Sequence, residues 1–170
     1  MILNELTETA DRRIELHVRA DDPAPGHHSD VVETLRELDA DGRIDGFDVS
    51  TWPERATLSP DRPGVDVVDA YEHFQSWASE RGVSINPPFV VRTGTRTLVG
   101  DEYAVLRTPT ACLAVYDGFE LVGVFPCVDG DTVHTVDDAL STLESTTRTR
   151  RASPRGPRSW PAADRRPFAR

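Results

Sequence analysis

The sequence predicts a mixed α/β protein that folds as a single domain. Segments with alternating apolar and polar residues, typical of strands, are interspersed with longer segments whose apolar residues recur at helical spacing. The chain has 170 residues, a length that suits one domain better than two. It has no apolar run near the roughly 18 residues of a membrane span and no basic-then-apolar leader, so we expect a cytoplasmic protein.

The first half of the chain predicts a β-α-β unit. Residues 14–19 alternate between apolar and polar side chains, which indicates a strand. A helix is expected to begin at Asp30, because Glu33 completes a capping-box pattern, and to end at Gly42. Alternation returns over residues 47–52, and the short connection between the two strands favours a right-handed β-α-β unit.

The middle of the chain predicts a second helix followed by extra strands. After a proline-rich loop over residues 53–64, apolar residues at helical spacing run from Val67 to Ala78, the strongest such stripe in the chain. Residues 89–93 and 97–107 then have the composition of strands, and we expect them to form an inserted β segment.

A hairpin and a last helix complete the predicted domain. Residues 110–116 and 120–125 flank an Asp-Gly pair, which is a strong signal for a tight turn. Thr135 and Asp138 form a capping-box pattern at the start of the last helix. With the inserted β segment set aside, the predicted order of elements is β-α-β-α-β-β-α.

This order resembles the thioredoxin-like fold over residues 14–144, and the sharpest local similarity is Thr108-Pro109 ahead of the hairpin. In thioredoxin-like proteins a cis-proline precedes the first strand of the hairpin, so the resemblance implies a cis peptide at Pro109. The reactive cysteine pair of that family would fall in residues 22–29, which contain no cysteine. The resemblance therefore implies a redox-inactive module that binds a peptide or protein near Pro109.

Two histidines occupy that cysteine-free loop, His27 and His28. Imidazoles at the N-terminus of a helix could receive an anion or a proton, although exposed loop histidines are more commonly inert. Together with Thr108 and Pro109, they make up the candidate contacts for a ligand or a partner.

Residues suited to catalysis or metal binding are sparse. Cys112 and Cys127 lie too far apart along the predicted hairpin for a disulfide, and we expect both to be small buried residues. Two cysteines and His134 fall short of a zinc site. The sequence has no nucleophile-elbow, metalloprotease or phosphate-binding glycine motif. We therefore expect no catalytic, metal-binding or cofactor-binding residue and do not favour an enzyme.

The charge composition indicates a salt-adapted surface. All 19 basic residues are arginine, the 29 acidic residues include 18 aspartates, and the formal net charge is −10. Short carboxylates hold water without the apolar stem of lysine, which keeps a protein soluble where salt screens charges to a few ångströms. We expect a protein of a halophilic archaeon; a GC-rich genome, which also favours arginine over lysine, points to the same kind of organism.

The charge is distributed unevenly along the chain. Residues 146–170 contain eight arginines, four prolines and one acidic residue, a net charge of +7, which leaves −17 for residues 1–145. We expect a disordered tail there, behind a polar, weakly helical lead-in over residues 1–13 and an α/β domain over residues 14–145. Arginines interleaved with aromatic residues could contact nucleic acid, but a solvated extension is the favoured interpretation. The candidate nucleic-acid contacts are Arg148, Arg150, Arg151, Arg155 and Arg158.

A further pattern involves residues 14–19, 42–49 and 71–78, together with Tyr103 and the strand at Cys112. These features resemble an uncharacterised family of small haloarchaeal proteins whose members are commonly labelled helix-turn-helix domain proteins. The resemblance implies a regulatory role with DNA as the partner.

The residues themselves do not form a helix-turn-helix pattern. That motif needs two helices joined by about three or four residues, whereas a strand and a proline-rich loop separate the two best predicted helices. The second of these helices carries four acidic residues against Arg81, which is the wrong sign for the DNA major groove. Two functions therefore stay open: a regulatory protein that touches nucleic acid through its tail, and a redox-inactive binding module beside Pro109.

Overall fold

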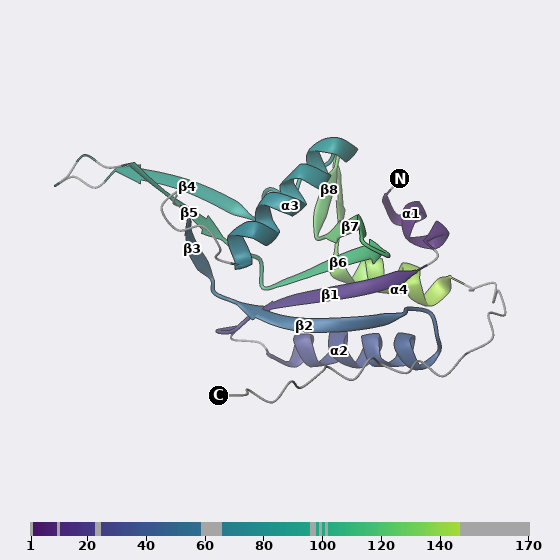
Figure 1. The fold of residues 1–170 in the computed structure, drawn as a ribbon. Coiled ribbons are helices and arrows are strands. Elements are labelled where there is room, and N and C mark those ends of the chain that lie inside the picture. Colours follow the sequence, from purple (N-terminus) through teal and green to yellow (C-terminus); the bar gives the residue numbers. More distant parts are fainter. Residues whose placement is uncertain are drawn as a thin grey trace, which may run out of the picture.

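The computed structural model describes residues 2–9, 11–22, 25–58, 66–95, 98, 100 and 102–146. In this part of the chain the fold is mixed α/β, as the sequence predicts, with helices on both faces of a central sheet (Figure 1). None of the described helices is long and apolar enough to cross a membrane. The elements in chain order are α1 (Ile2–Glu8), β1 (Arg12–Arg19), α2 (Pro25–Ala40), β2 (Gly46–Trp52), β3 (Arg55–Leu58), α3 (Asp66–Arg81), β4 (Val90–Thr95), β5 (Glu102–Arg107), β6 (Ala111–Asp117), β7 (Glu120–Phe125), β8 (Cys127–Asp129), β9 (Thr132–His134) and α4 (Val136–Ser145).

The central sheet has the strand order β2-β1-β6-β7. β1 and β2 are parallel and are connected through α2, so the predicted β-α-β unit is confirmed. β6 pairs antiparallel with both β1 and β7. α2 and α4 contact each other on one face of this sheet, while α3 lies over the opposite face and contacts β7 (Figure 1).

Alternation along β1 explains how this strand contributes to the core. Ile14 and Leu16 are fully buried, whereas the alternate residues Arg13, Glu15 and His17 keep part of their surface in solvent. α2 adds Leu35 and α4 adds Leu143, both also fully buried. Burial of an aliphatic side chain of this size stabilises a fold by about 1.5–3 kcal/mol. The alternation that predicts the strand therefore also identifies the face that it buries.

Helix α1 lies in the polar, weakly helical lead-in that the sequence predicts. Its apolar residues Ile2 and Leu6 are buried, and α1 contacts β7 and α4. The Arg12 side chain, only 3% exposed, donates from Nε to the Leu6 carbonyl and from Nη2 to the Thr7 carbonyl, both at 3.1 Å. Carbonyls in the last turn of a helix have no partner within that helix, so Arg12 caps α1.

The inserted β segment forms a second, three-stranded sheet with the order β3-β5-β4. β4 and β5 confirm the two predicted strands, and they project away from the central sheet (Figure 1). β3 lies in the stretch that was expected to be a loop, because four residues beside prolines are too few to show alternation, yet they pair antiparallel with β5. Ala56 of β3 and Leu106 of β5 are buried.

The β6–β7 hairpin and α4 confirm the last two predicted elements. At the start of α4, the Thr135 hydroxyl accepts a hydrogen bond from the Asp138 amide, and the Asp138 carboxylate accepts one from the Thr135 amide at 2.8 Å. The hairpin turns at Gly118, where φ is 61°, and a bulge between Val115 and Tyr116 shifts its register. The short β8–β9 hairpin was not predicted.

The implied cis peptide at Pro109 is wrong. The cis peptide bonds of the described residues are Asn86–Pro87 and Phe125–Pro126. Pro109 lies in the connection between β5 and β6. Its carbonyl accepts a hydrogen bond from Trp52 Nε1 at 3.3 Å, which ties this connection to the end of β2 in the trans form.

Candidate functional site

The structure brings three of the four candidate ligand contacts to one edge of the central sheet. At the carboxyl end of β1, the Arg19 guanidinium donates to the Thr108 carbonyl at 2.8 Å, and Pro109 follows directly. Asp22 lies just beyond the same end of β1, and its carboxylate is 2.9 Å from His28 Nε2. Arg19 and Thr108, 89 positions apart in sequence, therefore meet where β1 ends, and the Asp22–His28 pair lies just beyond the same end.

Thr108 and Pro109 use their polar groups within the protein. The Thr108 hydroxyl donates to the Pro53 carbonyl at 2.8 Å, its amide donates to the Glu54 carbonyl at 3.0 Å, and the residue is 1% exposed. The Pro109 carbonyl is occupied by the Trp52 indole. These bonds hold the start of β3 against the β5–β6 connection, which is a structural task.

His27 and His28 lie in the first turn of α2 rather than in the loop before it. His27 is exposed, whereas the His28 side chain is 13% exposed and its partner Asp22 is 9% exposed. The two imidazole rings are 6.5 Å apart. The Asp22 carboxylate lies directly beside the His28 imidazole. An external anion would therefore have to displace this largely buried carboxylate in order to reach His28.

A polar cluster that the sequence analysis missed lies on the other face of β1. His17 Nδ1 is 2.7 Å from the Ser50 hydroxyl on β2, and His17 Nε2 is 3.7 Å from the Glu15 carboxylate. The imidazole stacks on the Trp52 ring, with 4.8 Å between centroids. Burial lowers the pKa of His17 below its ordinary 6.5, opposed by the negative charge of Glu15, so the imidazole is neutral near pH 7.

Tyr116 and His73 extend this cluster to β6 and α3. Tyr116 hydrogen-bonds Glu15, and burial, together with that carboxylate, raises the pKa of its phenol well above the ordinary value. The His73 ring of α3 lies 6.3 Å from the Tyr116 ring. The signal that could have located the cluster is the polar half of the alternation in β1. Glu15 and His17 share one face of the strand, so they must contact side chains of β2 and β6 on that face. The cluster can hold protons on its imidazole, hydroxyl and phenol groups. Two hollows on the described surface are lined by other residues.

The two cysteines are free and fully buried. Burial raises the pKa of the Cys127 thiol to about 12, with a further contribution from Asp129, and raises that of Cys112 even more. A thiol with so high a pKa is protonated and is a poor nucleophile. Within the described residues, no group of three or more His, Cys, Asp or Glu side chains could hold a metal ion.

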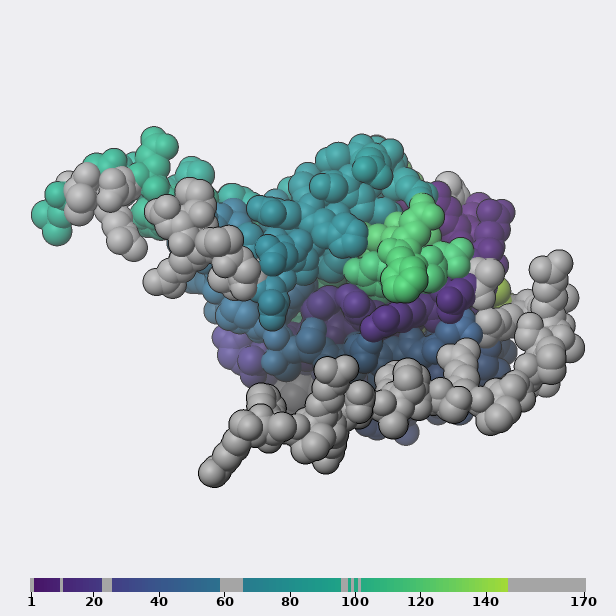
Figure 2. Space-filling view, viewed as in Figure 1, coloured from purple at the N-terminus to yellow at the C-terminus, as the bar shows by residue number. Residues whose placement is uncertain are grey.

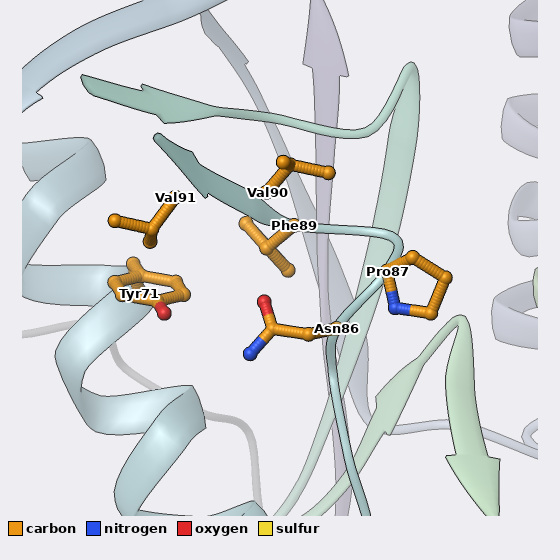
Figure 3. A pocket seen from close by; sticks show the side chains of 6 residues that line it. All are labelled: Tyr71, Asn86, Pro87, Phe89, Val90 and Val91. Carbon is orange, nitrogen blue, oxygen red and sulfur yellow. The ribbon is translucent and has the colours of Figure 1, made fainter. Parts of the chain in front are cut away.

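One surface hollow lies between α3 and the start of β4 and has a volume of about 460 Å³ (Figure 3). Apolar side chains line most of it, including Tyr71 and Phe89, whose rings are 5.4 Å apart. The Asn86 side chain points toward Tyr71 and supplies an amide. No charged residue lines this hollow, so it suits an apolar group better than an ion.

The remaining candidate contacts, the tail arginines Arg148, Arg150, Arg151, Arg155 and Arg158, lie outside the described residues. The helices of the described residues do not follow one another directly: at least one strand separates each consecutive pair. Between α2 and α3, the chain forms β2 and β3. The tandem helices of a helix-turn-helix are therefore not found in the described part of the chain.

A family model described as a helix-turn-helix domain matches residues 6–148 of the chain. This match begins within α1 and ends just after α4, so it spans the central sheet, the three-stranded sheet and the β8–β9 hairpin. No curated protein and no solved structure is similar to the chain at a significant level.

Proposed function

Since the chain belongs to the helix-turn-helix domain family, we propose that it is a non-enzymatic regulatory protein that binds DNA. The observation that carries the proposal is the extent of the family match, from residue 6 to residue 148, which includes nearly every described element. Helix-turn-helix proteins read DNA through a helix placed in the major groove. In this chain the contact uses other parts, because α2 and α3 are not arranged as tandem helices.

The proposed setting is the cytoplasm of a halophilic archaeon. It is supported by the exclusive use of arginine as basic residue and by the charge of −17 on residues 1–145. We also propose the division of the chain into a short lead-in, a domain over residues 14–145 and a disordered basic tail over residues 146–170. α1 belongs with the domain in this division, because Ile2 and Leu6 are buried against it.

A thioredoxin-like layout is a second proposal about the central sheet. It is supported by the strand order β2-β1-β6-β7, with a parallel β1–β2 pair and two antiparallel pairs. The associated function, binding of a peptide near Pro109, is not favoured, because the polar groups of Thr108 and Pro109 are engaged within the protein.

The test is a selection of duplex DNA from a pool with a randomised central sequence, using the full chain at KCl concentrations where it is folded. We expect enriched sequences whose affinity falls linearly with the logarithm of salt concentration. A failure to retain any duplex across these KCl concentrations contradicts the proposal. A matched full-length variant in which serine replaces the candidate tail arginines measures the share of binding that the tail contributes. These arginines are Arg148, Arg150, Arg151, Arg155 and Arg158.

A further inference from the structure

At the end nearest the core, the three-stranded sheet β3-β5-β4 has one side that packs against the core and one side that faces solvent. Ala56 and Leu106 are paired across β3 and β5 and are buried at 8% and 0% exposure, so their side belongs to the core. Successive residues of a strand point to opposite faces. The residues directly before and after Ala56 and Leu106 along their strands therefore point outward. The three-stranded sheet that carries them projects from the central sheet (Figures 1 and 2).

The register places three arginines on this outward side. Arg55 of β3 is the direct partner of Arg107 of β5. Two residues further along the sheet, roughly 7 Å away, Arg92 of β4 is the partner of Val105. We call the surface formed by Arg55, Arg92, Arg107 and Tyr103 the arginine face.

The side chains of the arginine face surround one hollow. Its volume is about 340 Å³. The residues that line it are Arg55, Arg92, Thr93, Tyr103, Val105 and Arg107. The three guanidinium groups therefore border the same space.

Tyr103 lies on the same row of β5 as Arg107, and its cross-strand partner is a glycine. Gly94 pairs with Tyr103, and a Cβ atom on Gly94 would come within 2.7 Å of the Tyr103 ring. Only glycine leaves room for the ring to lie against the backbone of β4. Tyr103 is 39% exposed and offers an aromatic surface beside the guanidinium groups.

The charge of the arginine face is opposite to that of the domain. The outward rows of the three strands carry no acidic residue, and among the described residues the acid that pairs with this face is Glu54, whose carboxylate is 3.1 Å from Arg107 and 3.9 Å from Arg55. Arg92 forms no ion pair with any other described residue. The face therefore has a formal charge of about +2 in a domain that is strongly acidic.

Most other arginines of the described residues already have partners within the protein. Five of them donate to backbone carbonyls or to carboxylates: Arg12, Arg13, Arg19, Arg43 and Arg81. The ion pairs of Glu54 are partly exposed and weak, so Arg55 and Arg107 can exchange them for a stronger partner. Arginine binds phosphate through two parallel hydrogen bonds, which makes a phosphodiester a suitable partner.

We propose that the arginine face binds the phosphate backbone of duplex DNA. This inference rests on the proposed function. It assigns DNA binding to the surface of a sheet, whereas the family label implies binding through tandem helices. Sheets contact DNA in several known classes of regulator. The arginine face is positively charged on an otherwise acidic chain, so it complements a polyanion with regularly spaced phosphates. The Tyr103 ring can lie against a sugar or an exposed base.

The experiment measures binding of the full-length protein to labelled duplex DNA by fluorescence anisotropy over a series of KCl concentrations. The test variant is Arg92→Glu with Arg107→Glu, and a milder version is Arg92→Gln with Arg107→Gln, in case the reversal disturbs folding. The matched control is Arg36→Glu, which changes an exposed arginine on α2. Circular dichroism melting confirms that each variant is folded.

We expect the paired substitutions to weaken binding by about tenfold or more and to reduce the salt slope by about 2. Arg36→Glu should bind as the wild type does. If the wild type binds DNA and both paired variants bind equally well with an unchanged slope, the arginine face is not the contact surface, while the proposed function stands. If the wild type binds no duplex at any salt concentration at which it is folded, both are overturned. Binding of a poly-aspartate peptide in place of DNA, lost in the paired variants, would assign the face to an acidic protein partner.

Discussion

His17 and Ser50 face each other across the parallel strands β1 and β2, and the imidazole Nδ1 lies 2.7 Å from the hydroxyl. The register of the two strands produces this contact, because each residue is the direct partner of the other. The imidazole is held between the Trp52 ring and the Phe74 ring. A charged ring in this position would lose hydration, so the fold favours the neutral form.

The stability of the protein should therefore fall as pH falls through 6.5. The folded pKa of His17 is below its unfolded value of 6.5, so the unfolded chain takes up the proton first and is favoured by acid. The stabilisation from neutral His17 is complete above pH 6.5 and is lost between 6.5 and the folded pKa. In urea unfolding at several pH values, His17→Phe should show a smaller loss across this range, whereas the control His27→Phe, at an exposed site, should match the wild type. Equal pH dependence in all three proteins would contradict this.

Replacement of Arg12 should destabilise the fold strongly. Its guanidinium donates to the carbonyls of Leu6, Thr7 and Arg43, each at 3.1 Å. We expect Arg12→Met to cost about 3 kcal/mol in urea unfolding, because each buried carbonyl that loses its donor costs about 1–3 kcal/mol. Arg12→Lys should also be destabilising, since an ammonium cannot form the same fork.

The neighbouring Arg13 provides the control for this prediction. Its ion pair with Asp48 is 2.9 Å long but more than half exposed on both sides. An exposed pair of this kind contributes at most about 1 kcal/mol, so Arg13→Met should leave stability nearly unchanged. A similar loss in both variants would mean that Arg12 does not act through the α1 carbonyls.

The thiols should be unreactive in the folded protein. Cys112 and Cys127 are both fully buried, and burial raises the pKa of Cys127 to about 12. Labelling with a thiol reagent at neutral pH should be slow in native conditions and rapid in urea, and the protein should not reduce disulfides. Cys112→Ser should cost about 1–3 kcal/mol because it buries a hydroxyl in an apolar site. Rapid native labelling of either cysteine would contradict this.

Folding should depend on salt. The charge of −17 on residues 1–145 repels itself in dilute buffer, and screening relieves this repulsion over the first few hundred millimolar of salt. Thermal melting followed by circular dichroism should show a lower melting temperature on dilution from molar KCl. A melting temperature independent of KCl would remove the argument for a salt-adapted surface.

Local patterns in the sequence determined most of the secondary structure. The alternation of Ile14 and Leu16, the helical stripe from Val67 to Ala78 and the capping box of Thr135 and Asp138 each predict an element that the structure contains. These signals work because each depends on neighbours within a few residues, whose spacing the backbone geometry of a helix or strand dictates.

Tertiary structure alone decided which residues meet. β3 is too short to show a pattern and exists because it pairs with β5. The sequence signal for helix α1 is weak, because its seven residues form a stable helix only when Ile2 and Leu6 are buried and Arg12 caps it. The His17–Ser50 contact and the arginine face arise from pairing between strands distant in sequence. Such pairings depend on the packing of the whole domain, so single segments of the sequence carry no signal for them.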